Sequence, residues 1–492
     1  MINNKRRTNK RRIHKRRTNK RRTNKRIKVI LKKFYGGYAK PECLPIYNQK
    51  NNEDILPTDN INNFSDYTIT KIFNSNTSSQ SVIAFGIHTN SKIPIALKFY
   101  IEYDITEINN DYPIGNPKNY MYQKIIAKSK SLDYEGELYK KINGLGICNI
   151  VKIVSIIKKD IKFMPLYRFP NADISFPIPE FIFDKQIDID KQIEYKTIFM
   201  ETLKINKSPL KYIKMLCCTI TERRLYSISL KEFLLKSCNI FGKLNIDILY
   251  LKSIIFQIIS TLAMMNKYGF QHNDLHMENI LYDNNPNESK IIYKIYTTPG
   301  PSPIPDPEPD TSSIMNSEKE NSESSHINSK LSNKLYNTHL KDTIDITIDV
   351  KKYGKILFFD WDRGTYANLG KNEYLDFGGD NISLCRIEGE CNYINNWFDL
   401  YHIMKQLKTL VFSIGTSKIK TEFIEFFKRC IENEAIIPTS TILGNLCYPD
   451  PIKSNKCTVN NKKNPYGIKT PEEILVNELK IGGFFNVLIT SI

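Results

Sequence analysis

The spacing of apolar residues changes along the chain, and this change limits the possible folds more than any other feature. In the first half, apolar and polar residues alternate in short runs, which predicts strands at Tyr67–Phe73, Ser81–His88 and Pro94–Tyr100. A run with helical spacing follows at Tyr134–Ile142 and stops at Gly144. The first half is therefore predicted to be a small sheet with one helix.

The second half has mainly helical periodicity. Two further strands are predicted before it, at Ile150–Ile157 and Lys211–Ile220, with an insertion of undefined structure between them. Later segments are predicted to be a short helix at Ser229–Cys238 and a long helix over 245–268, capped by Asn245 and ending before Gly269. A strand at Lys355–Phe359 and another helix at Asn395–Leu410 follow. The long helix has an apolar stripe formed by Ile248, Leu251, Ile255, Ile258, Leu262 and Met265. Strands followed by helices indicate an α+β chain with two lobes.

Positive charge is concentrated at the N-terminus. Residues 1–33 hold 17 of the 71 Lys and Arg residues and no acidic residue, mostly in the repeats KRRTN and KRRIH. The rest of the chain, with 52 Asp and Glu, is nearly neutral, which argues against a protein whose whole surface binds nucleic acid. We expect residues 1–60 to be a disordered basic tail and linker. Residues 5–33 could direct nuclear import, contact nucleic acid or an anionic membrane, or only be solvated.

A second biased segment interrupts the helical half. Six prolines lie between Pro299 and Pro309, and Ser, Asn and Glu follow them, which predicts a disordered surface insertion over residues 283–350.

The cysteines and the apolar runs bear on location. The 10 cysteines include an adjacent pair, Cys217 and Cys218, but no C-x-x-C spacing, which favours reduced thiols over a disulfide framework or a zinc site. No run reaches the length of a membrane span, and the N-terminus lacks the apolar segment of a secretory signal. We therefore expect an intracellular protein without a transmembrane segment.

Three separate motifs carry acidic, amide and lysine side chains on loops or strand ends. QHNDLHMENIL at Gln271–Leu281 follows the long helix, ILFFDWDRG at Ile356–Gly364 delivers Asp360 from an apolar strand, and IALK at Ile95–Lys98 places a lysine on a strand. Two oxygen ligands, a separate carboxylate and a strand lysine are the groups that phosphoryl transfer from ATP requires.

These motifs resemble, in order, the V-A-I-K, H-R-D-L-x-x-x-N and D-F-G motifs of the protein-kinase superfamily, and EGELYKKI resembles the start of its N-lobe helix. The resemblance covers roughly residues 61–430. It implies a small antiparallel-sheet N-lobe over residues 61–222 and a mainly helical C-lobe over 223–492. Composition and insertions also resemble kinase-like proteins of giant DNA viruses, which would place the protein in a virion.

The resemblance assigns roles on the nucleotide side. Lys98 would hold the ATP phosphates, with Glu135 favoured over Glu137 as its carboxylate partner. Ala96, on the same strand face as Lys98, would lie against the adenine, and the adenine edge would meet backbone groups of Thr219, Ile220, Thr221 and Glu222.

On the acceptor side, Asp274 would orient the attacking hydroxyl, while Asn279 and Asp360 would bind Mg²⁺. Asp399 resembles the carboxylate that braces the catalytic loop. For His272 and His276 we favour packed, hydrogen-bonded side chains over direct catalysis, and no nearby His or Cys completes a zinc site.

The chain departs from the family pattern at several points. The phosphate-covering turn, residues 74–81, has no glycine, which would weaken ATP binding. Asn273 stands where many kinases have an arginine, so we expect activity that does not depend on a phosphorylated activation loop. Asp362 replaces the glycine of D-F-G, and no A-P-E follows it.

The function expected from these residues is Mg·ATP-dependent phosphorylation of Ser or Thr in protein substrates. Two alternatives remain open: a small-molecule or lipid kinase of the same fold, which DLHMEN and DWD both suit, and a pseudokinase scaffold, which the glycine-free turn favours.

Overall fold

The computed structural model describes one short strand near the N-terminus and, with gaps, most of the chain from residue 63 onward. The described residues are 42–47, 63–73, 81–113, 115–168, 175–204, 210–296, 343–377, 392, 394, 396–431, 468–480 and 482–490. Residues 1–33 of the predicted basic tail, residues 74–80 of the turn predicted over 74–81, and the proline-rich residues 299–309 lie outside them.

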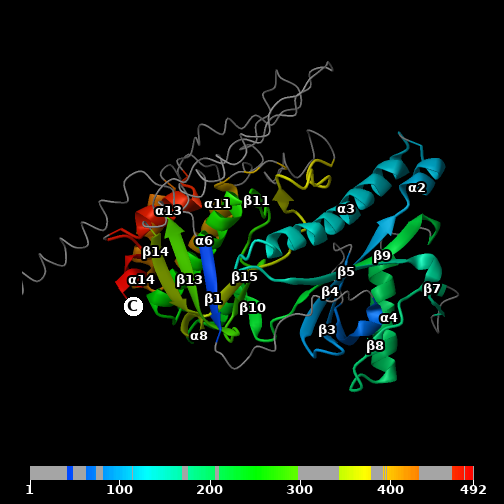
Figure 1. The fold of residues 1–492 in the computed structure, drawn as a ribbon, viewed down its shortest axis with the longest axis horizontal. Helices are drawn as coiled ribbons and strands as arrows, with labels where there is room; N and C mark the ends of the chain where they lie inside the picture. The colour runs from blue at the N-terminus through cyan, green and yellow to red at the C-terminus, as the bar shows by residue number, and fades with distance from the viewer. Residues whose placement is uncertain are drawn as a thin grey trace, which may run out of the picture.

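A six-stranded sheet forms the first part of the fold (Figure 1). Its order is β5-β9-β4-β3-β2-β8, and all neighbours are antiparallel except β2 and β8. The strands are β2 (Tyr67–Ile72), β3 (Val82–His88), β4 (Pro94–Tyr103), β5 (Ile153–Asp160), β8 (Ile182–Phe183) and β9 (Ile213–Glu222). The strands predicted at 67–73, 81–88 and 94–100 are therefore present, and β4 runs three residues further than predicted.

The helix α3 (Pro117–Asn143) crosses beside this sheet (Figure 1). It begins at the cap Asn116, whose side chain accepts from the amide of Lys118. Only its last third was predicted. The earlier turns bury small polar side chains such as Ser129 and Ser131, so they have no continuous apolar stripe to signal a helix.

The insertion between β5 and β9 has its own secondary structure. It contains β6 (Leu166–Arg168), β7 (Ser175–Pro177), β8 and α4 (Ile189–Lys204), while α2 (Ile105–Asp111) precedes α3. Phe99 of β4 packs edge-on against Phe181 and Phe199, with ring centroids 5.6 and 5.2 Å away, so this insertion covers one face of the sheet.

The second half is built around α6 (Ile248–Lys267), which is buried along most of its length. Around it lie α5 (Leu230–Lys236), α11 (Phe398–Ile414), α12 (Ser417–Cys430), α13 (Pro471–Glu478) and α14 (Asn486–Thr490). The cap of α6 is Asp247 and not the predicted Asn245: Asp247 Oδ1 accepts from the amide of Leu249 at 3.0 Å. Among the described helices, α6 alone is long and apolar enough to cross a membrane, but 78% of its most apolar stretch is buried inside the protein.

Two segments that we expected to be disordered contain strands. Glu42–Tyr47 forms β1, and β13 (Glu288–Tyr296) and β14 (Thr343–Asp349) lie within the predicted insertion; together they make a sheet of order β1-β13-β14. The helix α8 (Val350–Tyr353) follows directly. The proline-rich composition of residues 299–309 suggested disorder for the whole segment. It drew attention away from the alternation of apolar and polar residues in β13, where Ile291, Tyr293 and Ile295 are buried.

The expectation of reduced thiols is also wrong for one pair, because Cys43 of β1 forms a disulfide with Cys148, in the loop after α3. Their separation of 105 residues in the sequence left no local spacing that could reveal the bond. Among the described cysteines, Cys217, Cys218, Cys238 and Cys430 are free.

Buried apolar side chains form two large clusters. One lies between the six-stranded sheet, α4 and the start of α3; the other surrounds α6 and extends to β13, β14, α11 and α12. The molecule is thus a mixed α/β protein with two cores, and α3 contributes residues to both, Ile126 to one and Leu138 to the other.

Candidate active site

Two short strands bring the acidic motifs together. β12 (Ile280–Asp283) pairs antiparallel with β15 (Lys355–Phe358), with Ile280 opposite Phe358, and β10 (Ser227–Ser229) completes this sheet on the other side of β12. The amide of Phe359 donates to the carbonyl of Asn279 at 3.2 Å. The segment that enters β12 and the segment that leaves β15 therefore meet at one end of the sheet, which places residues 274–279 beside residues 359–362.

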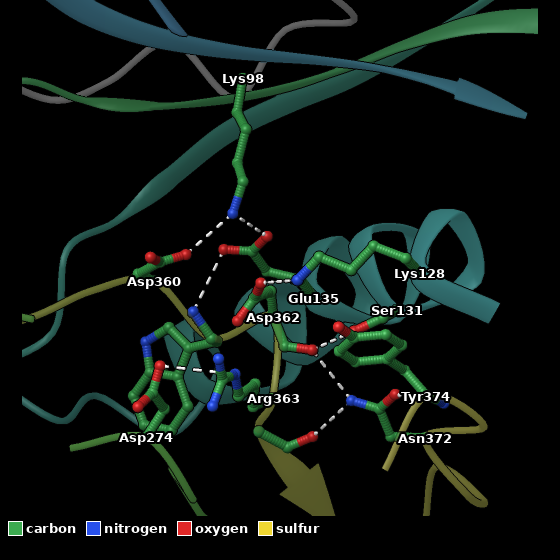
Figure 2. A network of polar contacts seen from close by, with 12 residues as sticks. Lys98, Lys128, Ser131, Glu135, Asp274, Asp360, Asp362, Arg363, Asn372 and Tyr374 are labelled. Atoms are coloured by element: carbon green, nitrogen blue, oxygen red, sulfur yellow. Dashed lines mark hydrogen bonds and ion pairs between the residues drawn. The ribbon is translucent and has the colours of Figure 1, made fainter. Parts of the chain in front are cut away.

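Lys98 joins these segments to α3. It lies on β4 opposite Thr219 of β9, and its ammonium donates to Glu135 Oε2 at 2.7 Å and to Asp360 Oδ1 at 2.8 Å (Figure 2). Glu135 is thus the partner of Lys98, as favoured from the helical spacing. Glu137 is half exposed and pairs with Lys140 at 2.8 Å instead.

Burial and charge act in opposite directions on this cluster. Burial alone would lower the pKa of Lys98, but the carboxylates of Asp360 and Glu135 raise the pKa well above its usual value. Burial raises the pKa of Glu135 to about 7, although Lys98 opposes this shift. Lys98 therefore remains a cation at neutral pH, whereas Glu135 is unusually easy to protonate.

Asp274 lies close to two basic side chains. Its Oδ2 is 3.6 Å from Nε of Arg363 and its Oδ1 is 3.8 Å from Nε2 of His276. Burial raises the pKa of Asp274, and Arg363 and His276 counteract this. Its carbonyl accepts a hydrogen bond from Nδ2 of Asn279 at 2.9 Å. The carboxylate is therefore placed at a partly polar site where it can accept a hydrogen bond from a ligand.

Asp360 has an unusual backbone, with φ at 62°, and its amide donates to the Tyr139 hydroxyl at 3.0 Å. Left-handed angles in a non-glycine residue are uncommon and are often found at functional sites. The carboxylate of Asp360 is 39% exposed, so it remains open to a ligand despite its bond to Lys98.

A divalent cation would fit Asp360 together with Asn279. Because Nδ2 of Asn279 is bonded to the carbonyl of Asp274, the carboxamide oxygen is left as the donor, and oxygen is what Mg²⁺ prefers. Within the described residues, no group of three or more His, Cys, Asp or Glu side chains is arranged to hold a metal ion. Asp360 and Asn279 therefore offer oxygen donors for part of a cation's coordination, and other ligands would have to complete it.

Asp399 of α11 braces the loop that carries Asp274. Its carboxylate accepts from the amides of His272 at 2.7 Å and Asn273 at 2.8 Å. Burial raises the pKa of Asp399 to about 7, although both amide bonds lower it. Asn273 has φ at 66° and donates through Nδ2 to the carbonyl of Arg363 at 2.9 Å. This polar bridge joins the two acidic segments.

His272 is a packed side chain, as expected. Its Nε2 lies 2.9 Å from the carbonyl of Phe359, and its ring is 4.5 Å from that of Trp361. Burial lowers the pKa of His272 to about 4, so the ring is neutral at physiological pH.

The pairing of β9 bears on Thr219–Glu222, the residues that the resemblance placed at the edge of an adenine. Thr219, Ile220 and Thr221 are paired with β4 on one side and with β5 on the other, so the sheet uses their backbone groups. Ile220 is also buried opposite Leu97, on the face away from Lys98. Thr221, opposite the half-buried Ala96, shares the Lys98 face.

The amide of Glu222 donates to the carbonyl of Lys152, and the amide of Arg223 donates to the carbonyl of Pro94. The amides of Glu222 and Arg223 are therefore also bonded within the protein.

Several polar residues of this site were not predicted. They are Lys128, Ser131 and Tyr139 of α3, Arg363 beside Asp274, and Asn372, all of which contact the segment 360–364 or Asp274. The positions of Lys128, Ser131, Glu135 and Tyr139 at intervals of three and four residues are the signal that places them on one helix face.

Comparisons with known proteins yield likenesses to solved structures alone. No protein-family model matches the chain. No curated protein matches it either. Among solved structures, it is similar to the crystal structure of a Plasmodium kinase domain, at 14% sequence identity and a TM-score of 0.30, over 75% of this chain and 71% of that chain.

Proposed function

We propose that the protein is an ATP-dependent phosphotransferase that transfers the γ-phosphoryl group of Mg·ATP to Ser or Thr hydroxyls of protein substrates. The observation that carries this proposal is the bonding of one lysine, Lys98, to two carboxylates from distant segments, Glu135 and Asp360, at 2.7 and 2.8 Å. A structural ion pair needs only one partner. A lysine shared in this way is suited to receive phosphate oxygens in place of Asp360.

Each residue then has a separate task. Lys98 binds the α- and β-phosphates as a fixed positive charge, and Glu135 holds its ammonium in place. Asp360 and the carboxamide oxygen of Asn279 hold Mg²⁺, which neutralises charge on the phosphates when it is bound.

Asp274 accepts a hydrogen bond from the attacking hydroxyl and orients it. A carboxylate suits this task because a loose transition state needs positioning more than proton removal. The Ser or Thr preference and the protein nature of the acceptor are part of the proposal and rest on the resemblance of HNDLHMEN to the kinase catalytic loop.

The test is phosphoryl transfer from labelled ATP in the presence of Mg²⁺ to the protein itself and to a mixture of basic proteins. We expect transfer by the full chain, and Asp274→Asn should reduce the rate by about 10²–10⁴-fold. Glu278→Gln is the matched control, because this exposed acid lies on the same loop but pairs with Lys231 at 2.7 Å.

Other outcomes would lead to other assignments. Label found only on small molecules would identify a small-molecule or lipid kinase. Nucleotide binding without transfer would identify a pseudokinase scaffold, and transfer unaffected by Asp274→Asn would contradict the role of this carboxylate.

A further inference from the structure

One face of α3 supplies a series of polar contacts to the segment 360–362. Lys128 forms an ion pair with the carboxylate of Asp362, and the Ser131 hydroxyl donates to the carbonyl of Asp362. One turn further, Glu135 Oε1 accepts from the amide of Trp361 at 3.1 Å, and the Tyr139 hydroxyl accepts from the amide of Asp360. Residues at these intervals lie on one side of a helix, so α3 lies along the segment over three turns (Figure 2).

The Lys128–Asp362 pair is well enclosed. The side chains of Lys128 and Asp362 are only 16% and 14% exposed. The ammonium also lies 4.7 Å from the centre of the Tyr374 ring. A partly desolvated ion pair is stronger than one in water and is costly to break from one side only.

Further contacts also hold the segment. Nδ2 of Asn372 donates to the carbonyls of Asp362 at 3.0 Å and Gly364 at 3.2 Å. Gly364 lies so near α3 that a Cβ there would be 2.5 Å from Cδ2 of Leu138. The segment is therefore held by α3 and by residue 372 together, and the glycine permits its close approach to α3.

We propose that Lys128 and Asp362 are positioning residues, whose ion pair holds α3 against the metal-binding segment so that Lys98, Glu135 and Asp360 are assembled without covalent modification of the protein. Glu135 and Asp360 must both reach one ammonium, and they come from different elements. The pair lies seven residues before Glu135 on α3 and two residues after Asp360, so it fixes both elements at a second point. This inference rests on the proposed phosphotransferase function.

The same helix offers a matched control pair. Lys130 bonds to Glu373 at 2.7 Å, but these side chains are 46% and 59% exposed. Exposed ion pairs contribute little. If enclosure and position matter, Lys130→Met should keep kcat within about twofold of the wild type, because the pair that it removes is screened by water.

The experiment is a double-mutant cycle with Lys128→Met and Asp362→Asn in the full chain, read as kcat and KM for ATP. Each single variant should lower kcat by about tenfold, and the double variant should lower it no further, because the two residues act through one interaction. Lys128→Arg keeps the charge and should recover most of the lost kcat. Additive losses, or no rescue by Lys128→Arg, would overturn the proposal.

A second measurement does not depend on activity. Hydrogen exchange of the α3 amides should accelerate in Lys128→Met relative to Lys130→Met, while the amides of α6 should exchange at an unchanged rate. If the wild type transfers no phosphate, the proposed function fails, yet this comparison still tests the contact. Equal exchange in the two variants would contradict the positioning role even in an active enzyme.

Discussion

At the scale of single residues, the site depends on competition between burial and charge at Lys98 and Glu135. Burial makes the ionised form of Glu135 costly, and its bond to Lys98 restores it only in part, which leaves its pKa at about 7. Protonated Glu135 carries no charge to hold the ammonium. The ionisation of this one carboxyl group therefore controls whether Lys98 is correctly oriented.

The first prediction concerns pH. The pKa of Glu135 is raised and the active form is ionised, so kcat/KM should fall as the pH drops below about 7, by up to about tenfold per pH unit. Glu135→Gln should be much less active and should lose this dependence on pH. A pH profile of phosphoryl transfer checks both. The same acidic limb in Glu135→Gln would assign it to another group, such as Asp274.

The second prediction concerns the brace. Asp399→Ala removes the acceptor of two buried amides, those of His272 and Asn273, and each unsatisfied group costs about 1–3 kcal/mol. We expect the free energy of unfolding in urea to fall by about 2–5 kcal/mol, and transfer activity to fall with it. Thr409→Ala, on the exposed face of the same helix, should change the stability little. A stability loss in Asp399→Ala as small as in this control would contradict the bracing role.

Some polar residues of this region could be singled out from the sequence because each stands in a short motif next to a strand or helix that periodicity reveals. Lys98, Asp274, Asn279 and Asp360 belong to this group. Lys128 and Arg363 could not be predicted, since their partners are 234 residues away in one case and 89 in the other, and a surface charge has the same local pattern. The prediction for Thr219–Glu222 depends on a property that no local pattern shows, because whether a backbone group is free depends on pairing on both sides of β9.

At the scale of elements, the long apolar runs were predicted and the weakly patterned ones were not. α6 and α11 have clear apolar stripes, whereas the first turns of α3 do not. β1 was hidden because Leu44 and Ile46 are exposed and, among the side chains of β1 that the structure describes, Cys43 alone is buried. A strand at the edge of a sheet needs few apolar residues, so its sequence resembles that of a loop.

The third prediction concerns the covalent link between β1 and the loop after α3. A disulfide that spans 105 residues restricts the unfolded chain, and such bonds typically contribute about 2–4 kcal/mol. Reduction, or Cys43→Ser, should therefore lower the melting temperature of the protein. Cys238→Ser is the control, because that thiol is free. Equal melting temperatures with and without a reducing agent would show that the bond does not contribute.

At the scale of the whole molecule, the two cores meet along α3, which contributes residues to both. The mixture of strands and helices, with a sheet in the first half and mainly helices in the second, followed from the sequence. The additional sheet of β1, β13 and β14 did not, since its strands come from segments far apart in the chain and no local pattern shows that they pair.

The fourth prediction concerns the basic N-terminus, residues 1–33, with its 17 positive charges. Its deletion should weaken binding to polyanions, and the affinity of the full chain should fall steeply with salt because bound counterions are released. Duplex DNA and vesicles containing anionic lipid distinguish the two kinds of partner. The melting temperature should not change, since so polar a segment offers little apolar area to bury. A lower melting temperature would mean that the segment is docked on the folded protein.

The pairing of β12 with β15 has a consequence for how this chain tolerates change. Asp283 lies opposite Lys355, and the site lies at the other end of the pair, where Ile280 meets Phe358. Residues 284–354 thus leave and re-enter the sheet on the side remote from Asp274 and Asp360. The strands β13 and β14 of that excursion belong to the core around α6, so it is the connection between them that can be lengthened while the acidic segments stay in register. This makes the connection a natural location for evolutionary insertions and for an affinity tag.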